Sequence, residues 1–333
     1  MSSISTKMLQ AAAGGGGASG SYIALGHQNT PYLTLLDHTT PGSVSLATTY
    51  TLASDGRFMC FSPDGMYLAV AHEGAPCFTL LDHTTPGSLS LATTYSLAGT
   101  GYGTSFSPDG DYIAVGHAGP PRFTLLDHTT PGSVSHAADQ TSGGSWVDFD
   151  PVNGDYIAIA AGEGMQLLDH TTPGSISLAT SYATTNSDVY ASEFSSDGNY
   201  IGLGGQYSPH LFTVLDHTTP GSLSYASGYA LNSRCAGVTW SSDGNYVATA
   251  MVNGPYITLL NFSSGSVTFA ASYTVINQPF GLSFSPDTKY IGVGTGYDTP
   301  YFSLLDHTTP GSLSLATTYT PAGLTYGVAF SPT

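Results

Sequence analysis

The sequence predicts an all-β protein, a seven-bladed β-propeller whose blades are four-stranded antiparallel sheets. Two landmarks recur along its 333 residues at intervals of 42–47 residues, and a period of about 40–45 residues is typical of propeller blades. The first landmark, LLDHTTPGS or a relative of it, is anchored at Asp37, Asp82, Asp127, Asp169, Asp216, Asn261 and Asp306. The second, the aromatic residue of FSPDG or a relative, lies at Phe61, Phe106, Phe149, Phe194, Trp240, Phe284 and Phe330.

Each repeat divides into four short strands. In the third repeat these begin with GYGTSF at 101–106, YIAVGH at 112–117 and RFTLLD at 122–127, and the fourth strand is of the SLATTY type seen at 90–95. Apolar and polar residues alternate over four to seven positions, and Asp-Gly or Pro-Gly pairs separate the runs, which is a strand signature. Helical spacing does not persist anywhere, so the chain is an all-β meander.

The turn residues have identifiable roles. The Asp37 side chain can accept a hydrogen bond from the backbone of Thr39, and Pro41-Gly42 suits the central positions of a type II turn. The Asp-Gly pair of the SPDG motif supplies the positive φ that a tight hairpin between the first and second strands requires.

The two ends of the repeat region complete each other. The first strand-like run, SYIALGH at 21–27, is a second strand, and the last, TYGVAFSPT at 325–333, is a first strand. We therefore expect 325–333 to pair with 21–27 and close the ring, burying Val328 and Phe330. On this interpretation the chain consists of a leader at 1–19 and a propeller at 20–333.

Composition excludes several classes of function. Five Lys and Arg stand against 22 Asp and Glu, a formal charge of −17, which opposes binding to nucleic acid or to an anionic membrane surface. The three cysteines show no CxxC spacing, so a disulfide framework or thiolate zinc site is poorly supported. There is no apolar run of ~20 residues and no secretory signal. The sequence also lacks a phosphate-binding glycine loop and an HExxH motif, so we expect no cofactor and no metal.

Histidines fall into two sets. The first lies in the repeated turn, where we predict packing within each turn, because a metal would need ligands from separate blades. Its members are His38, His83, His128, His170, His217 and His307. The second set, in the loops between second and third strands, is interpreted either as ligand contacts or as ordinary exposed loop histidines. Its members are His27, His72 and His117.

Two faces of the ring differ in sequence. One carries the nearly invariant SPDG and DHTTPGS turns, whereas the other carries loops that vary between blades and are rich in Tyr, Pro, Gly and His. A specific ligand should favour the varied face, because amphipathic aromatics offer large contact area at low entropic cost. The predicted contacts are Tyr32, Tyr207, Tyr256, Tyr297 and Tyr301, with His27, His72, His117 and Arg122 as polar partners.

Asp148 and Glu193 stand in neighbouring repeats, each directly before the aromatic residue of the first strand. Paired carboxylates can serve acid–base chemistry or hold a cation. No nucleophile with a paired base lies nearby in the sequence, so hydrogen bonds within the ring are the favoured interpretation.

The FSPDG, YIAVG and LLD pattern over residues 21–333 resembles the WD-repeat family, with Leu-Asp at 36–37 where that family has Trp-Asp. The resemblance implies a propeller fold and a scaffolding or binding role. STKMLQAAAGGGG at 5–17 resembles leaders of tailed-phage structural proteins, which implies a tether to other virion proteins, with Ile4, Met8 and Leu9 as apolar contacts.

The combined expectation is a non-enzymatic, virion-associated propeller. It would be a tail fibre, baseplate or capsid-surface protein that displays a surface for a host glycan or protein. The alternatives are a WD-repeat scaffold that recruits another protein and a propeller enzyme with a metal in the central channel.

Overall fold

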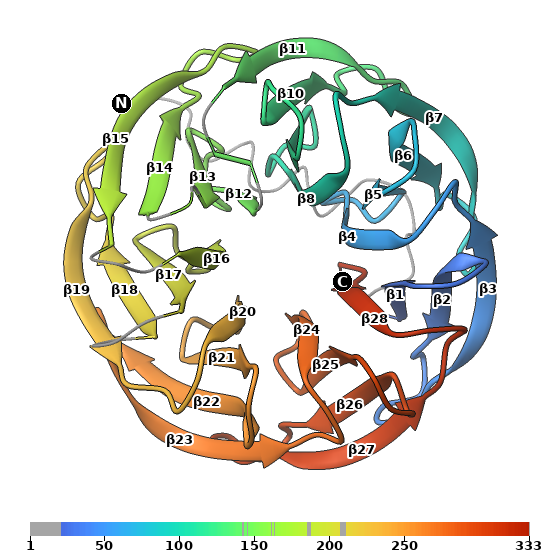
Figure 1. Cartoon of the computed structure of the whole chain (residues 1–333), viewed down its shortest axis with the longest axis vertical. Helices are drawn as coiled ribbons and strands as arrows, with labels where there is room; N and C mark the ends of the chain where they lie inside the picture. The colour runs from blue at the N-terminus through green and yellow to red at the C-terminus, as the bar shows by residue number, and fades with distance from the viewer. Residues whose placement is uncertain are drawn as a thin grey trace, which may run out of the picture.

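The chain folds into a closed ring of seven four-stranded antiparallel sheets (Figure 1), which confirms the predicted fold class. The computed structural model describes residues 21–332, apart from 142, 145, 161, 163, 185–187 and 207–210. The expected leader at 1–19, with Ile4, Met8 and Leu9, lies outside the described residues. Within the described ranges no helix could cross a membrane.

Each blade is a sheet of four strands, which are arranged in order from the centre of the ring to its rim. The innermost strands are β28 (Thr325–Phe330), β4 (Gly56–Phe61), β8 (Gly101–Phe106), β12 (Val147–Phe149), β16 (Val189–Phe194), β20 (Cys235–Trp240) and β24 (Pro279–Phe284). The second strands are β1 (Tyr22–His27), β5 (Tyr67–His72), β9 (Tyr112–His117), β13 (Tyr156–Ala160), β17 (Tyr200–Gly205), β21 (Tyr246–Met251) and β25 (Tyr290–Thr295). The third strands are β2 (Tyr32–Asp37), β6 (Cys77–Asp82), β10 (Phe123–Asp127), β14 (Gly164–Asp169), β18 (Phe212–Asp216), β22 (Tyr256–Ser263) and β26 (Phe302–Asp306).

The outermost strands are β3 (Ser45–Thr51), β7 (Ser90–Ser96), β11 (Ser135–Gln140), β15 (Ser177–Ala183), β19 (Ser224–Tyr229), β23 (Ser266–Thr274) and β27 (Ser314–Tyr319). Blade 1 consists of β28 and β1–β3, and blades 2 to 7 follow in chain order from β4 to β27. Figure 1 shows the outermost strands forming the rim of the disc.

Ring closure takes place in blade 1, as predicted. Strand β28 pairs with β1 in antiparallel register, with Val328 opposite Leu25 and Phe330 opposite Ile23. Val328 and Phe330 each keep only 8% of their surface exposed. The last and first strands of the repeat region therefore share one sheet.

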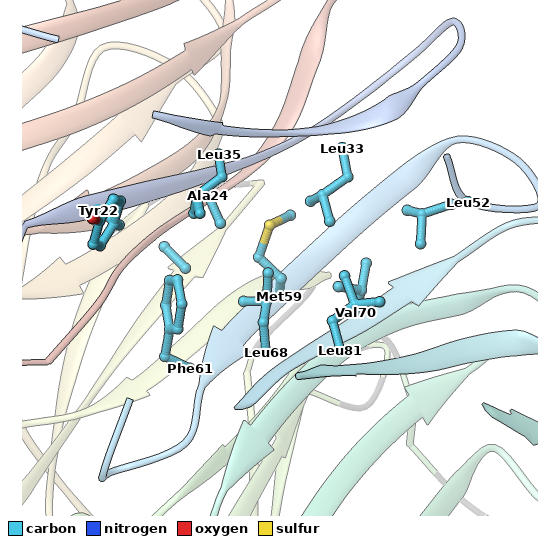
Figure 2. Close-up of a cluster of buried hydrophobic side chains, with 11 residues drawn as sticks. Tyr22, Ala24, Leu33, Leu35, Leu52, Met59, Phe61, Leu68, Val70 and Leu81 are labelled. Atoms are coloured by element: carbon cyan, nitrogen blue, oxygen red, sulfur yellow. The ribbon is translucent and has the colours of Figure 1, made fainter. Parts of the chain in front are cut away.

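The core lies between the blades and not inside any one of them. Because each sheet packs against a neighbour on both faces, a second strand such as β5 is buried at all six positions. Figure 2 shows one such layer, in which Leu33 and Leu35 of blade 1 face Met59 and Leu68 of blade 2. The alternation of polar and apolar residues that marks a half-exposed strand is therefore weak in the second strands.

The repeated DHTTPGS turn joins each blade to the one before it. In blade 2 the ring of His83 packs edge-on against Tyr22 of blade 1, with centroids 5.2 Å apart. His83 Nδ1 lies 2.9 Å from the carbonyl oxygen of Gly65, while its Nε2 accepts the backbone N–H of Gly87 at 3.4 Å. A carbonyl oxygen can only accept, so Nδ1 carries a proton and donates it. We call this arrangement the histidine clasp, and it confirms the predicted packing of the turn histidines.

The predicted turn chemistry is also confirmed. The backbone N–H of Thr39 donates to Asp37 Oδ1 at 2.8 Å, as an Asx-turn requires. Gly42 has a φ of +72° in the Pro-Gly turn, and Gly65 has a φ of +72° in the SPDG hairpin.

Blade 6 departs from the clasp. Its turn, NFSSGS, places Phe262 where the other blades have histidine, and the ring of Phe262 packs against Tyr200 and Trp240 with centroids 5.1 and 4.7 Å away. Strands β22 and β23 run on into a tight hairpin, in which Ser264 and Gly265 both have positive φ. The ring packing of the clasp is therefore kept in blade 6, whereas the hydrogen bonds of the histidine side chain are lost.

Candidate functional site

The innermost strands surround a cavity of about 270 Å³ on the axis of the ring. Each blade contributes to its wall the residue directly before the first-strand aromatic, and we call these seven residues the belt. They are Cys60, Ser105, Asp148, Glu193, Thr239, Ser283 and Ala329. The volume is close to the ~300 Å³ lower limit of small-molecule sites. Only two belt side chains are acidic, and they are neighbours.

Asp148 links three blades through hydrogen bonds. Its Oδ1 accepts the hydroxyl of Ser105 from blade 3 at 3.1 Å, and its Oδ2 accepts the backbone N–H of Phe194 from blade 5 at 2.8 Å. The Ser105 oxygen in turn accepts the backbone N–H of Phe149 at 3.1 Å. Both oxygens of the carboxyl group are therefore held in place.

Glu193 makes the corresponding contact with blade 6. Its Oε1 accepts the backbone N–H of Trp240 at 3.0 Å and the hydroxyl of Thr239 at 3.2 Å. The indole N–H of Trp240 donates to the Glu193 backbone carbonyl at 3.0 Å. The predicted hydrogen bonding of both carboxyls within the ring is thus confirmed, and both hydrogen bonds to the Glu193 side chain fall on Oε1.

The pKa values of both carboxyls are raised above their usual values. Burial deep in the ring raises the pKa of Asp148, although hydrogen bonds from Phe194 and Ser105 oppose the shift. Burial also raises the pKa of Glu193, and the negative charge of Asp148 raises it further. Each side chain nevertheless keeps some exposed surface facing the cavity. A carboxylate and a carboxylic acid side by side near neutral pH are suited to acid–base chemistry.

Aromatic side chains cover part of the cavity next to the carboxyls. Phe58 and Trp146 both line it, and their rings meet edge to face with centroids 4.4 Å apart. Between them, on blade 3, Gly103 has no side chain to fill the space. Apolar ring surface beside two carboxyls is a combination that suits a molecule with both C–H faces and hydroxyl groups.

We call the face of the ring that carries the varied loops the loop face. It carries two arginines stacked on tyrosines, close to the points where the innermost strands begin. The guanidinium of Arg57 lies 3.9 Å from the centroid of the Tyr326 ring, and it is also paired with Glu73. The guanidinium of Arg234 lies 4.8 Å from the centroid of the Tyr190 ring. Arg57 and Arg234 therefore lie on this face, together with Glu73, whereas the repeated carboxylates of the turns lie on the other.

The histidines expected in the varied loops are buried. His27 and His72 are 0% exposed and His117 is 1% exposed, and each Nε2 lies 2.9–3.0 Å from a threonine hydroxyl on the third strand of its own blade. They are the last residues of second strands and point into the sheets. This burial opposes the expected contact with a ligand and makes them parts of the core.

Burial lowers the pKa of His72 to about 4. An unfolded histidine takes up its proton near pH 6.5, so unfolding binds a proton between these two values. Stability should therefore be complete above pH 6.5 and decline as the pH falls toward 4, by about 1–3 kcal/mol for this one group. We expect His72→Gln, which can keep the bond to Thr79, to flatten the fall in melting temperature over that range. The exposed His136→Gln is the control, and equal slopes for wild type and H72Q would contradict the prediction.

The other predicted contacts lie on the loop face but not in the cavity. Tyr32, Tyr256, Tyr297 and Tyr301 belong to the loops of three consecutive blades, 1, 6 and 7, and Tyr297 is 66% exposed. Arg122 is exposed on blade 3. Tyr207 lies outside the described residues. Ligand binding by these loops stays a prediction, whereas the belt residues Ser105 and Thr239 and the aromatics Phe58 and Trp146 were not predicted as site residues.

Comparison with known proteins gives a likeness of fold. No family model matches the chain, and no curated protein matches its sequence. The periplasmic gluconolactonase PpgL of Pseudomonas aeruginosa has 16% identity and a TM-score of 0.78, covering 93% of this chain and 98% of that one. A putative 6-phosphogluconolactonase of Bacteroides uniformis has 12% identity and a TM-score of 0.80, with coverage of 93% and 98%. The β-propeller domain of Cps50 (Swd1) of Myceliophteria thermophila has 13% identity and a TM-score of 0.67, with coverage of 83% and 90%.

These matches correct the functional expectation. The similarity to a WD-repeat propeller is confirmed for the fold. The interpretation as a non-enzymatic virion protein, with tail-fibre, receptor-binding or host-attachment roles, is wrong, because a gluconolactonase and two putative 6-phosphogluconolactonases have the same fold over 93–95% of the chain. That interpretation rested on the near-identity of the repeats, on the low content of charged residues and on residues 5–17, a short stretch rich in Ala and Gly that carries little chemical information.

Proposed function

We propose that the protein is a hydrolase of small polyhydroxylated lactones, acting at Asp148 and Glu193 in the central cavity. The observation that carries the proposal is the buried carboxyl pair, whose members are held by different hydrogen bonds and open into one cavity of about 270 Å³. The proposal draws further support from the similar propellers of a gluconolactonase and a putative 6-phosphogluconolactonase.

The chemistry follows from the two protonation states. Asp148, as the carboxylate, takes a proton from a water molecule while the water oxygen forms a bond to the lactone carbonyl carbon. Glu193, as the acid, donates a hydrogen bond to the carbonyl oxygen as negative charge develops there. When the ring C–O bond breaks and the carbonyl re-forms, the proton that Asp148 took from water passes to the departing oxygen, which returns Asp148 to the carboxylate and gives an open-chain hydroxy acid. General acid–base catalysis of this kind contributes about 10²–10⁴-fold.

Phe58 and Trp146 supply the non-reacting contacts. Their rings can cover the C–H face of a sugar ring, and their apolar surface excludes water from one side of the cavity. The two belt carboxyls then meet the polar edge of the substrate.

Hydrolysis of D-glucono-1,5-lactone, measured above its spontaneous rate, tests the proposal. We expect Asp148→Asn to lower kcat by about 100-fold or more. Asp82→Asn is the matched control, because Asn261 occupies the same turn position in blade 6 and shows that the turn accepts asparagine. Equal rates for wild type and D148N, or no rate above background with a panel of five- and six-membered sugar lactones, would exclude a lactonase role for the pair.

A further inference from the structure

The two belt carboxyls differ in how their oxygens are held. Asp148 has a donor on each oxygen, from the Ser105 hydroxyl and the Phe194 backbone. Glu193 receives both of its side-chain hydrogen bonds on Oε1, from Thr239 and Trp240. Within the described ranges no donor reaches Glu193 Oε2. A carboxylate with a donor on each oxygen is better stabilised as an anion, whereas a carboxyl with one free oxygen can hold a proton there.

Ser105 is positioned to create this difference. Its oxygen accepts the backbone N–H of Phe149 at 3.1 Å, and this bond directs the hydroxyl proton away from the backbone and toward Asp148 Oδ1, also at 3.1 Å. Ser283, at the same belt position in blade 7, instead lies with its hydroxyl 3.4 Å from the carbonyl oxygen of Phe284. Equivalent serines therefore have different partners, and only Ser105 is bonded to a carboxyl.

Other titratable groups around the pair do not supply the same bias. Asp150, beyond β12, acts on Asp148 by charge repulsion, and Asp148 acts in the same way on Glu193 of β16. Cys60 on β4 has its pKa raised by burial to about 12, so its thiol is neutral. The hydroxyl of Ser105 is the one side-chain donor to Asp148 among the described residues.

We propose that Ser105 is a positioning residue that makes Asp148 the base and leaves Glu193 as the acid. The inference builds on the proposed function, but it concerns which carboxyl ionises first, and that can be measured in the ligand-free protein. Loss of one hydrogen bond to a charged group corresponds to about one pH unit in the titration of the acceptor.

The test is ¹³C NMR titration of the Asp and Glu side-chain carboxyls in wild type, Ser105→Ala, Ser105→Thr and the matched control Ser283→Ala. We expect S105A to move the Asp148 titration upward by about one pH unit. S105T keeps the hydroxyl and S283A keeps the whole contact, so both should titrate like wild type. Should S105A fail to fold, Ser105→Cys, whose S–H is a weak donor, takes its place in the same measurement.

Activity provides the second measurement. If lactone hydrolysis is observed, the acidic limb of the plot of kcat/KM against pH should move to higher pH by the same amount in S105A. At pH values below the limb, S105A should lose up to about tenfold in kcat/KM. Above the limb, the rates should be equal. An unchanged Asp148 titration in S105A overturns the role of Ser105 whatever the activity. A shifted titration without any hydrolysis supports that role and overturns only the proposed reaction.

Discussion

Replacing Glu193 with glutamine is expected to stabilise the protein at neutral and alkaline pH. Burial raises the pKa of this carboxyl from 4.5 to about 8, so the unfolded chain ionises first as the pH rises. Native stability is therefore complete below pH 4.5 and is lost progressively up to about pH 8. Glutamine keeps an oxygen that can accept from Trp240 and Thr239, and it has no charge to bury. We expect a gain of about 2–4 kcal/mol above pH 8, on the order of 3–6 °C in Tm.

Thermal melts of wild type and E193Q between pH 4 and 9 check this expectation. The two curves should coincide near pH 4 and separate as the pH rises. Glu73→Gln, a substitution of the same kind at a partly exposed residue, removes the pairing with Arg57 and should therefore give no gain in stability as the pH rises. A constant offset between wild type and E193Q at all pH values would show that Glu193 is not buried as an acid. If the proposed function holds, E193Q gains stability and loses activity together.

Deletion of residues 325–333 is expected to have the largest effect on stability. It removes β28, the innermost strand of blade 1, and with it the burial of Val328 and Phe330. Each of these side chains contributes roughly 1.5–3 kcal/mol by burial. The deletion also leaves the backbone of β1 unpaired on the side that faced β28, and this exposed sheet edge can associate with other chains. We expect a Tm lower by on the order of 10 °C, together with concentration-dependent association.

Melting curves and sedimentation of the truncated chain measure both effects. A synthetic peptide of residues 325–332 serves as the specific control, because it should restore the Tm and the monomer by occupying the empty place beside β1. A peptide with Val328 and Phe330 replaced by Ser should not. A truncated chain that remains monomeric with an unchanged Tm would show that closure contributes nothing to the fold.

The repeats predicted most of the fold because their signals are local and occur many times. The Asx-turn at Asp37, the positive φ of Gly65 and the pairing of 21–27 with the C-terminal strand each depend on a few neighbouring residues or on a count of strands. The placement of His72 could not be predicted in the same way. In this ring a second strand is buried on both faces, so alternation does not distinguish an inward residue from a loop residue.

The candidate site in the central cavity was not predicted as a site. Asp148 and Glu193 were recognised because carboxyls replace small or neutral residues at one position of the repeat. Their ring hydrogen bonds were also predicted, but the cavity shared with Phe58 and Trp146 was not. Those aromatics come from blades 2 and 4 and meet across Gly103 of blade 3. Contacts that skip a blade leave no periodic signal in the sequence.

The histidine clasps hold neighbouring blades together, whereas the belt lines the cavity. This separation of roles bears on how such a protein can evolve. The DHTTPGS turn that forms the clasp is the same in six blades, whereas the belt holds Cys, Ser, Asp, Glu, Thr, Ser and Ala on one common scaffold. A substitution in the belt alters the lining of the cavity and leaves every clasp intact. The belt can thus sample new combinations of side chains one blade at a time, because the clasps and the core between the blades supply the stability needed to tolerate them.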